Sequence, residues 1–112
     1  MTLSCTQLTP LLEAFVAATD VYDSTAFIAC FWDDAVVHDD GKTHRGRAAI
    51  RAWFEEVGRK YRFTIEVLAV DVNGDETTLT TRVCGDFKDS PVELRFSLNI
   101  ANEKIRALSV GE

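Results

Sequence analysis

The sequence predicts an α+β domain in which a cone-shaped, curved antiparallel sheet packs against three N-terminal helices. Up to Lys60 the apolar residues recur at helical spacing, whereas beyond it they alternate with polar residues. Turn pairs such as Asn73-Gly74 separate the alternating runs, as they do between consecutive antiparallel strands. Helices followed by strands form separate layers, and a curved sheet under helices leaves a conical hollow suited to a small ligand.

The first helix is predicted from the apolar residues between Leu8 and Val16, with Thr9 as N-cap and Pro10 in the first turn. A second, short helix is predicted after a new N-cap at Asp23, and its apolar side has three residues: Phe27, Ile28 and Phe31. Acidic side chains oppose the dipole at a helix C-terminus, so we place residues 33–34 in the following turn.

A small hairpin is predicted next. Residues 35–38 form a short apolar strand, Asp40-Gly41 is a typical tight-turn pair, and residues 43–45 run back as a second strand. The third helix begins at Gly46 and is predicted to stop at Gly58, before two basic residues. Its apolar stripe consists of Ile50, Trp53, Phe54 and Val57.

Four long antiparallel strands are predicted in the second half of the chain, the clearest being the alternating run from Val92 to Ile100. Cys84 is predicted to be a small buried residue. Four apolar residues are predicted to lie opposite the core face and to need cover: Leu68, Val70, Val72 and Leu108.

Composition excludes several classes of function. A net charge of -6 and dispersed basic residues argue against a nucleic-acid partner. The cysteines Cys5, Cys30 and Cys84 fit neither a disulfide framework nor a thiolate metal site, which indicates a reducing compartment. The N-terminus lacks signal-peptide character, and no stretch is apolar enough to span a membrane. We therefore expect one cytoplasmic domain, residues 1–112, with no membrane or nucleic-acid partner.

Asp39 is the candidate catalytic residue, because an aspartate entering an apolar hollow from a strand becomes a better base near neutral pH. The alternative is that Asp39 and Asp40 are turn residues that bind nearby backbone amides. His38 is a candidate proton shuttle, although strand alternation places His38 and Asp39 on opposite faces. A surface or cross-strand role is the alternative for both His38 and His44.

A metal site could be imagined from the two histidines and the neighbouring acids, but their spacing matches no site motif. We expect no metal and no cofactor. The aromatic residues either line a ligand pocket or simply form the core. Those closest to the predicted gap between helices and sheet are the candidate ligand-binding residues: Phe15, Phe31, Trp53, Phe54 and Phe96.

Residues 31–37 (Phe-Trp-Asp-Asp-Ala-Val-Val), the loop Asp39-Asp40-Gly41, residues 44–50 (His-Arg-Gly-Arg-Ala-Ala-Ile) and the pair Asn73-Gly74 carry a family resemblance. The chain resembles the nuclear transport factor 2-like superfamily and, within it, the SnoaL-like branch. The superfamily's cone-shaped frame hosts isomerases, cyclases, dehydratases and binding domains, so the resemblance implies the fold more sharply than the function.

The resemblance to the ketosteroid isomerase branch implies that Asp39 occupies the position of the catalytic base. It also implies a tyrosine donor on the first helix and an acid on a late strand, where this chain has Phe15 and Phe96. Losing an oxyanion donor costs about 3 to 4 kcal/mol of transition-state stabilisation. Steroid isomerisation by that route is therefore disfavoured, and a SnoaL-type cyclase remains open.

Two hypotheses follow. In the first, Asp39 is the general acid/base of an isomerase- or cyclase-type enzyme that acts on a small hydrophobic carbonyl compound. In the second, the chain is a non-catalytic module that binds a hydrophobic molecule or serves as a scaffold. Either could form a homodimer through the sheet, because the long strands carry apolar residues away from the predicted core.

Overall fold

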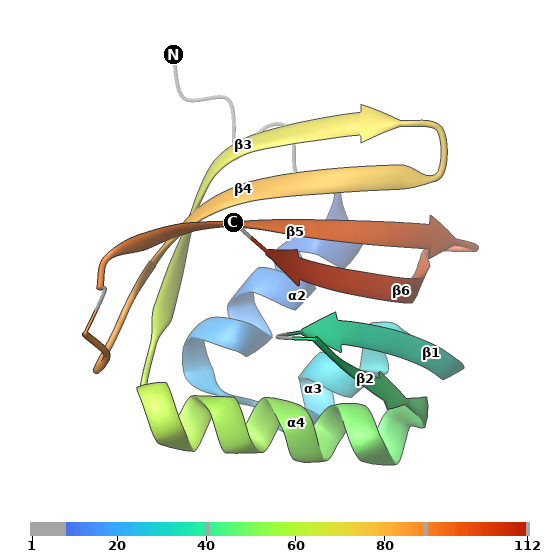
Figure 1. Cartoon of the computed structure of the whole chain (residues 1–112). Helices are drawn as coiled ribbons and strands as arrows, with labels where there is room; N and C mark the ends of the chain where they lie inside the picture. The colour runs from blue at the N-terminus through green and yellow to red at the C-terminus, as the bar shows by residue number, and fades with distance from the viewer. Residues whose placement is uncertain (1–8, 40, 89, 112) are drawn as a thin grey trace.

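A computed structural model describes residues 9–39, 41–88 and 90–111. Within these residues it confirms the α+β prediction: three helices pack on one curved, six-stranded sheet (Figure 1). The helices are α2 (Pro10–Val21), α3 (Ser24–Ala29) and α4 (Gly46–Tyr61). The strands are β1 (Phe31–Asp39), β2 (Lys42–Arg45), β3 (Thr64–Asn73), β4 (Glu76–Cys84), β5 (Val92–Ala101) and β6 (Lys104–Gly111).

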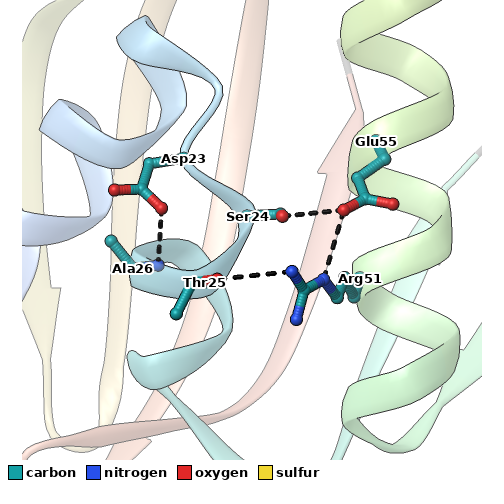
Figure 2. A network of polar contacts seen from close by, with 6 residues as sticks. All are labelled: Asp23, Ser24, Thr25, Ala26, Arg51 and Glu55. Atoms are coloured by element: carbon teal, nitrogen blue, oxygen red, sulfur yellow. Dashed lines mark hydrogen bonds and ion pairs between the residues drawn. The ribbon is translucent and has the colours of Figure 1, made fainter.

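The helix starts follow the predicted capping. Thr9 accepts a hydrogen bond from the backbone N–H of Leu12, with Pro10 in the first turn of α2. The Asp23 carboxylate likewise accepts from the Ala26 N–H and starts α3 (Figure 2). These caps satisfy N–H groups that have no partner inside the helix, which fixes where each helix begins.

Three predictions about element ends are wrong. Phe31 belongs to β1 rather than to the second helix, and residues 33–34 lie inside that strand instead of in a turn. Gly58 does not end the third helix, which continues to Tyr61 and is capped by Arg62 in the left-handed conformation. Gly58 is buried inside α4, against the ring of Tyr22. Gly58 therefore allows the close approach of the Tyr22 ring and does not end the helix.

The strand order is β2-β1-β6-β5-β4-β3. The predicted hairpin of β1 and β2 is present, and the four long strands β3 to β6 pair antiparallel as predicted. The pairing of β1 with β6 is parallel, so the sheet is antiparallel apart from this one junction among the described strands. The junction joins the hairpin to β6 and places β1 between β6 and the edge strand β2.

The helices cover one face of the sheet, with α4 against β1 and β2 and α2 against β3 (Figure 1). Between them lies a core rich in phenylalanine, in which Phe27 stacks on Phe54 with ring centroids 3.9 Å apart. Leu108 is fully buried and Val70 packs on this core, so the prediction that both face away from it is wrong. Irregular register in β3 and β6 shifts the alternation by one residue.

Two smaller outcomes concern surface residues. Cys84 is exposed, which corrects the prediction that it is buried. Val72 is exposed, as expected for a residue opposite the core. Within the described residues, no helix is long and apolar enough to cross a membrane.

Candidate functional site

The β1–β2 hairpin determines which side chains face the helices. Its register pairs Asp39 with Lys42 and Val37 with His44. Val37 is fully buried beneath the helices, and side chains alternate along a strand. Asp39 and His44 therefore lie on the helix-facing side of the sheet, next to α4.

Asp39 is held by a side chain from α4. The indole Nε1–H of Trp53 donates a hydrogen bond to Asp39 Oδ2 across 2.9 Å. Trp53 belongs to the apolar stripe of α4 and is half-buried, so the helix carries the indole to the end of β1. Asp39 Oδ1 has no hydrogen-bond partner within the part of the chain that is described. One carboxylate oxygen is thus positioned by the protein while the other stays available.

His44 lies near the same indole. Its ring centroid is 5.8 Å from that of Trp53, with the two planes inclined at 34°. The imidazole is half-buried, and no hydrogen-bond partner of its nitrogens is found among residues 9–39, 41–88 and 90–111. Asp39, Trp53 and His44 therefore form one group, which we call the indole cluster.

His38, the other histidine of the hairpin, is exposed and lies on the opposite face from Asp39, as strand alternation predicts. Its Nδ1 is 3.2 Å from Thr43 Oγ1 across the hairpin. The structure thus brings His44 toward Trp53 and Asp39, and it keeps His38 away from them. Asp40, the other predicted turn acid, lies outside the described residues.

An apolar row begins next to Asp39. Across the sheet, Asp39 pairs with Val110, Val110 with Phe96, and Phe96 with Leu79. Val110, Phe96 and Leu79 all belong to the helix-facing core or pack against it. Asp39 is therefore the polar end of a hydrophobic row that crosses the sheet.

The aromatic residues predicted to line a pocket occupy different environments. Phe15, Phe31 and Phe54 are fully buried and pack in one cluster around Phe27, whose ring lies 5.4, 5.1 and 3.9 Å from theirs. Phe96 meets Phe15 edge-to-face at 6.1 Å. Trp53, which is half-buried, is the most accessible of the five. The phenylalanine side chains fill the space between helices and sheet with one another.

Neither of two surface depressions is lined by a residue of the indole cluster. Their volumes are about 310 and 590 Å³, and they share Trp32 and Asn102. The Trp32 indole N–H is already bonded to the Ala101 carbonyl oxygen at 2.9 Å. Within the described residues, no group of three or more histidine, cysteine or acidic side chains is arranged to hold a metal ion.

Sequence reasoning missed the place of His44 and the hydrogen bond from Trp53. The first could have been found, because a hairpin that pairs Asp39 with Lys42 also puts His44 on the Asp39 face. The second could not, since Trp53 lies on another element.

Comparison with known proteins agrees with this architecture. The model of the SnoaL-like domain matches residues 12–106. A proposed polyketide cyclase from Sinorhizobium meliloti is 30% identical, with 94% of this chain and 96% of that chain covered and a TM-score of 0.90. No curated protein matches significantly.

Two more distant crystal structures share the fold. One is a protein with a ketosteroid isomerase-like fold from Catenulispora acidiphila, solved with trimethylamine (21% identity, 94% and 87% coverage, TM-score 0.81). The other is a cystatin-fold protein from Novosphingobium aromaticivorans (14% identity, 91% and 95% coverage, TM-score 0.76). The chain also shares its fold with a nuclear transport factor 2-like protein from Cytophaga hutchinsonii. Since the family model spans most of the sequence, the chain belongs to the SnoaL-like domain family.

Proposed function

We propose that the chain is an acid–base enzyme of the isomerase or cyclase type, acting on a small hydrophobic carbonyl compound with Asp39 as the general base. The observation that carries this proposal is the hydrogen bond from Trp53 to Asp39, which fixes one carboxylate oxygen at the end of an apolar row and leaves the other available. The likeness to the proposed polyketide cyclase from Sinorhizobium meliloti supports the same class of chemistry.

In the proposed function, the Asp39 carboxylate removes a proton from the carbon next to a carbonyl group. A general base must reach the proton it removes, and Asp39 Oδ1 is the oxygen not engaged by Trp53. In the proposed step, Asp39 takes a proton from the α-carbon, and the C–H electron pair becomes the carbon–carbon double bond of an enolate. The Trp53 bond orients the carboxylate, so that less of its motion must be lost in the transition state.

The proposal can be tested without the natural substrate. A suitable probe is 2-tetralone, a flat, apolar ketone, whose α-protons exchange with deuterium in D2O when a base removes them. Proton NMR then follows the catalysed exchange. Asp39→Asn keeps the size of the side chain and removes the base, so we expect the rate to fall by about 10²- to 10⁴-fold.

Asp34→Asn is the matched control, because Asp34 is an exposed aspartate on the same strand. We expect it to exchange like the unmodified protein. Equal exchange rates in Asp39→Asn and Asp34→Asn would contradict the assignment of Asp39 as the base.

A second candidate function is a non-catalytic, dimeric binding or scaffolding domain, favoured by the way Phe15, Phe31 and Phe54 fill the space that a ligand would occupy. In this reading the outer face of the sheet pairs with a second copy. Sedimentation at high protein concentration tests the dimer, and a monomer would count against it. A ligand that raises the melting temperature equally in the unmodified protein and in Asp39→Asn would favour binding without catalysis.

A further inference from the structure

We propose that His44 is the second catalytic residue, a proton donor that acts on the carbonyl oxygen while Asp39 acts on the neighbouring carbon. This inference rests on the proposed function. It assigns the donor to the carbonyl oxygen, which the proposed function leaves unassigned. An enolate oxygen needs a donor, and the two positions at which a donor was expected hold Phe15 and Phe96, whose rings contact each other. An imidazole is a donor that can also transfer its proton near neutral pH.

The register of the hairpin places the two groups at a usable separation. His44 pairs with Val37 and Asp39 pairs with Lys42, so His44 and Asp39 are diagonal neighbours on one face. Diagonal neighbours in antiparallel strands have Cβ atoms about 7 to 8 Å apart or slightly less. At this separation both side chains can reach neighbouring atoms of one small ligand, such as a carbonyl oxygen and its α-carbon.

Trp53 is close to both Asp39 and His44. Its indole donates to Asp39 Oδ2 at one end, and its ring lies 5.8 Å from the imidazole of His44. Both Asp39 Oδ1 and the His44 nitrogens are without partners within the described part of the chain. The half-buried indole thus offers an apolar ring surface that has a free carboxylate oxygen and an imidazole beside it.

The arrangement defines a balanced step. Asp39 takes the α-proton, the C–H electron pair forms the carbon–carbon double bond, and the carbonyl π electrons move to oxygen. His44 in its protonated form gives its proton to that oxygen. The products are the enol, a neutral imidazole and a protonated Asp39, and the reverse transfers return the ketone or its isomer. The matching substrate is a flat, apolar, enolisable carbonyl compound.

The first arm of the test measures deuterium exchange of 2-tetralone in His44→Phe. Phenylalanine keeps an aromatic ring beside Trp53 and removes both nitrogens. We expect kcat to fall by about 10²- to 10³-fold while KM changes by no more than about twofold, because the lost donor acts in the transition state. His38→Phe is the matched control, since His38 is on the same hairpin but on the opposite face. The His38→Phe variant should catalyse deuterium exchange of 2-tetralone at the rate of the unmodified protein.

The second arm measures binding and needs no turnover. The probe is 2-naphthol, which carries a hydroxyl at the position where the enol of 2-tetralone has one. The reference ligand is 2-methoxynaphthalene, in which a methoxy group replaces this hydroxyl. Titration followed at the indole N–H resonances of the two tryptophans should show that the unmodified protein binds 2-naphthol about tenfold more tightly than 2-methoxynaphthalene. His44→Phe should lose this preference, and His38→Phe should keep it.

The outcomes separate the two proposals. Loss of exchange in Asp39→Asn with full exchange in His44→Phe would overturn the role of His44 and leave Asp39 as the base. Unchanged exchange in Asp39→Asn would overturn the proposed function itself. If the unmodified protein does not exchange 2-tetralone, the binding arm decides: an unchanged 2-naphthol preference in His44→Phe overturns the inference, and its loss supports His44 as the group that binds the enol oxygen.

Discussion

The ring of Tyr22 lies directly against the backbone of Gly58, and a Cβ atom at Gly58 would stand 3.0 Å from Tyr22 Cδ1. The ring has little freedom to move away. Its hydroxyl donates to the Phe63 carbonyl oxygen, and the two rings meet in a T-shaped arrangement with centroids 5.8 Å apart. The contact locks the turn after α2 onto both α4 and the start of β3.

Gly58→Ala should therefore destabilise the protein, although alanine favours a helix by about 1 kcal/mol over glycine. Overpacking against a fixed ring costs about 1 to 3 kcal/mol, so we expect a net loss of roughly 1 kcal/mol in the free energy of unfolding. Urea denaturation measures it. In a Tyr22→Ala background the same substitution should become stabilising, and a loss of similar size there would show that Tyr22 is not the cause.

Gly85→Ala should be more damaging than Gly58→Ala. A Cβ at Gly85 would lie 2.7 Å from the Tyr61 carbonyl oxygen and 2.9 Å from the Phe63 Cα, and both are backbone atoms. The Asp86 N–H donates to the same Tyr61 oxygen at 2.7 Å, which holds the two segments together. We expect a loss of about 3 kcal/mol or more in the free energy of unfolding.

Gly111→Ala is the control for this experiment, because a Cβ at Gly111 would meet nothing within 4 Å. Its denaturation midpoint should stay near that of the unmodified protein. A Gly85→Ala variant as stable as Gly111→Ala would mean that the two segments can separate at little cost.

Arg47 should matter to stability through a backbone carbonyl more than through its ion pair. Its Nε and Nη2 donate to the Phe31 carbonyl oxygen at 3.2 and 2.7 Å. Its Nη1 is 3.0 Å from Asp33 Oδ1, but the Asp33 side chain is 90% exposed. Lysine cannot reproduce the forked donation, so Arg47→Lys should cost about 1 kcal/mol or more. Asp33→Asn should cost no more than about 0.5 kcal/mol. Chemical denaturation of both variants tests the order, and the reverse order would contradict it.

Glu55 should make the contact between α3 and α4 sensitive to acid. A hydrogen bond from the Ser24 hydroxyl, followed by one from Arg51 Nε, lowers the pKa of Glu55 from its ordinary value of 4.5 (Figure 2). A depressed pKa stabilises the folded state at pH values above the ordinary one, and the effect disappears as the pH falls through the folded-state value. Glu55→Gln should thus lower the melting temperature at pH 7, and the difference from the unmodified protein should shrink as the pH is lowered well below 4.5.

Glu56→Gln is the matched control for Glu55, since Glu56 is an exposed neighbour on α4. It should leave the melting temperature unchanged at both pH values. A melting temperature of Glu55→Gln that equals that of the unmodified protein at pH 7 would show that the network in Figure 2 does not stabilise the fold.

Trp53→Phe should test the orientation of Asp39 separately from its basicity. Phenylalanine retains an aromatic face toward His44 and loses the N–H that holds Asp39 Oδ2. For deuterium exchange of 2-tetralone we expect kcat to fall by about ten- to a hundredfold with KM nearly unchanged. Trp32→Phe, on the outer face, is the control. A rise in KM alone would instead indicate that Trp53 binds the substrate without orienting the base.

Part of the candidate site could be predicted from the hairpin sequence. Alternation along the strand correctly separates His38 from Asp39, because successive side chains point to opposite faces. The partner of Asp39 was not predictable in this way. Trp53 appears in the sequence only as a member of an apolar helical stripe, and its hydrogen bond depends on how α4 lies across β1.

The sequence by itself determined the kinds of element and most of their starts. The caps at Thr9 and Asp23, the stripe of the third helix and the alternation from Val92 to Ile100 are local signals, and each is present in the structure. Such signals depend on neighbours within a few residues, which is why they can be read without knowing the fold.

Only the tertiary structure decided how these elements are joined. The parallel pairing of β1 with β6 brings Phe31 opposite Ile105 and makes it part of a strand. Irregular register turns Leu108 into the core, because a shift of one residue exchanges the faces of a strand. The packing of α4 on the hairpin brings Trp53 to Asp39 and beside His44. These are contacts between segments far apart in the chain, and no local pattern of residues specifies them.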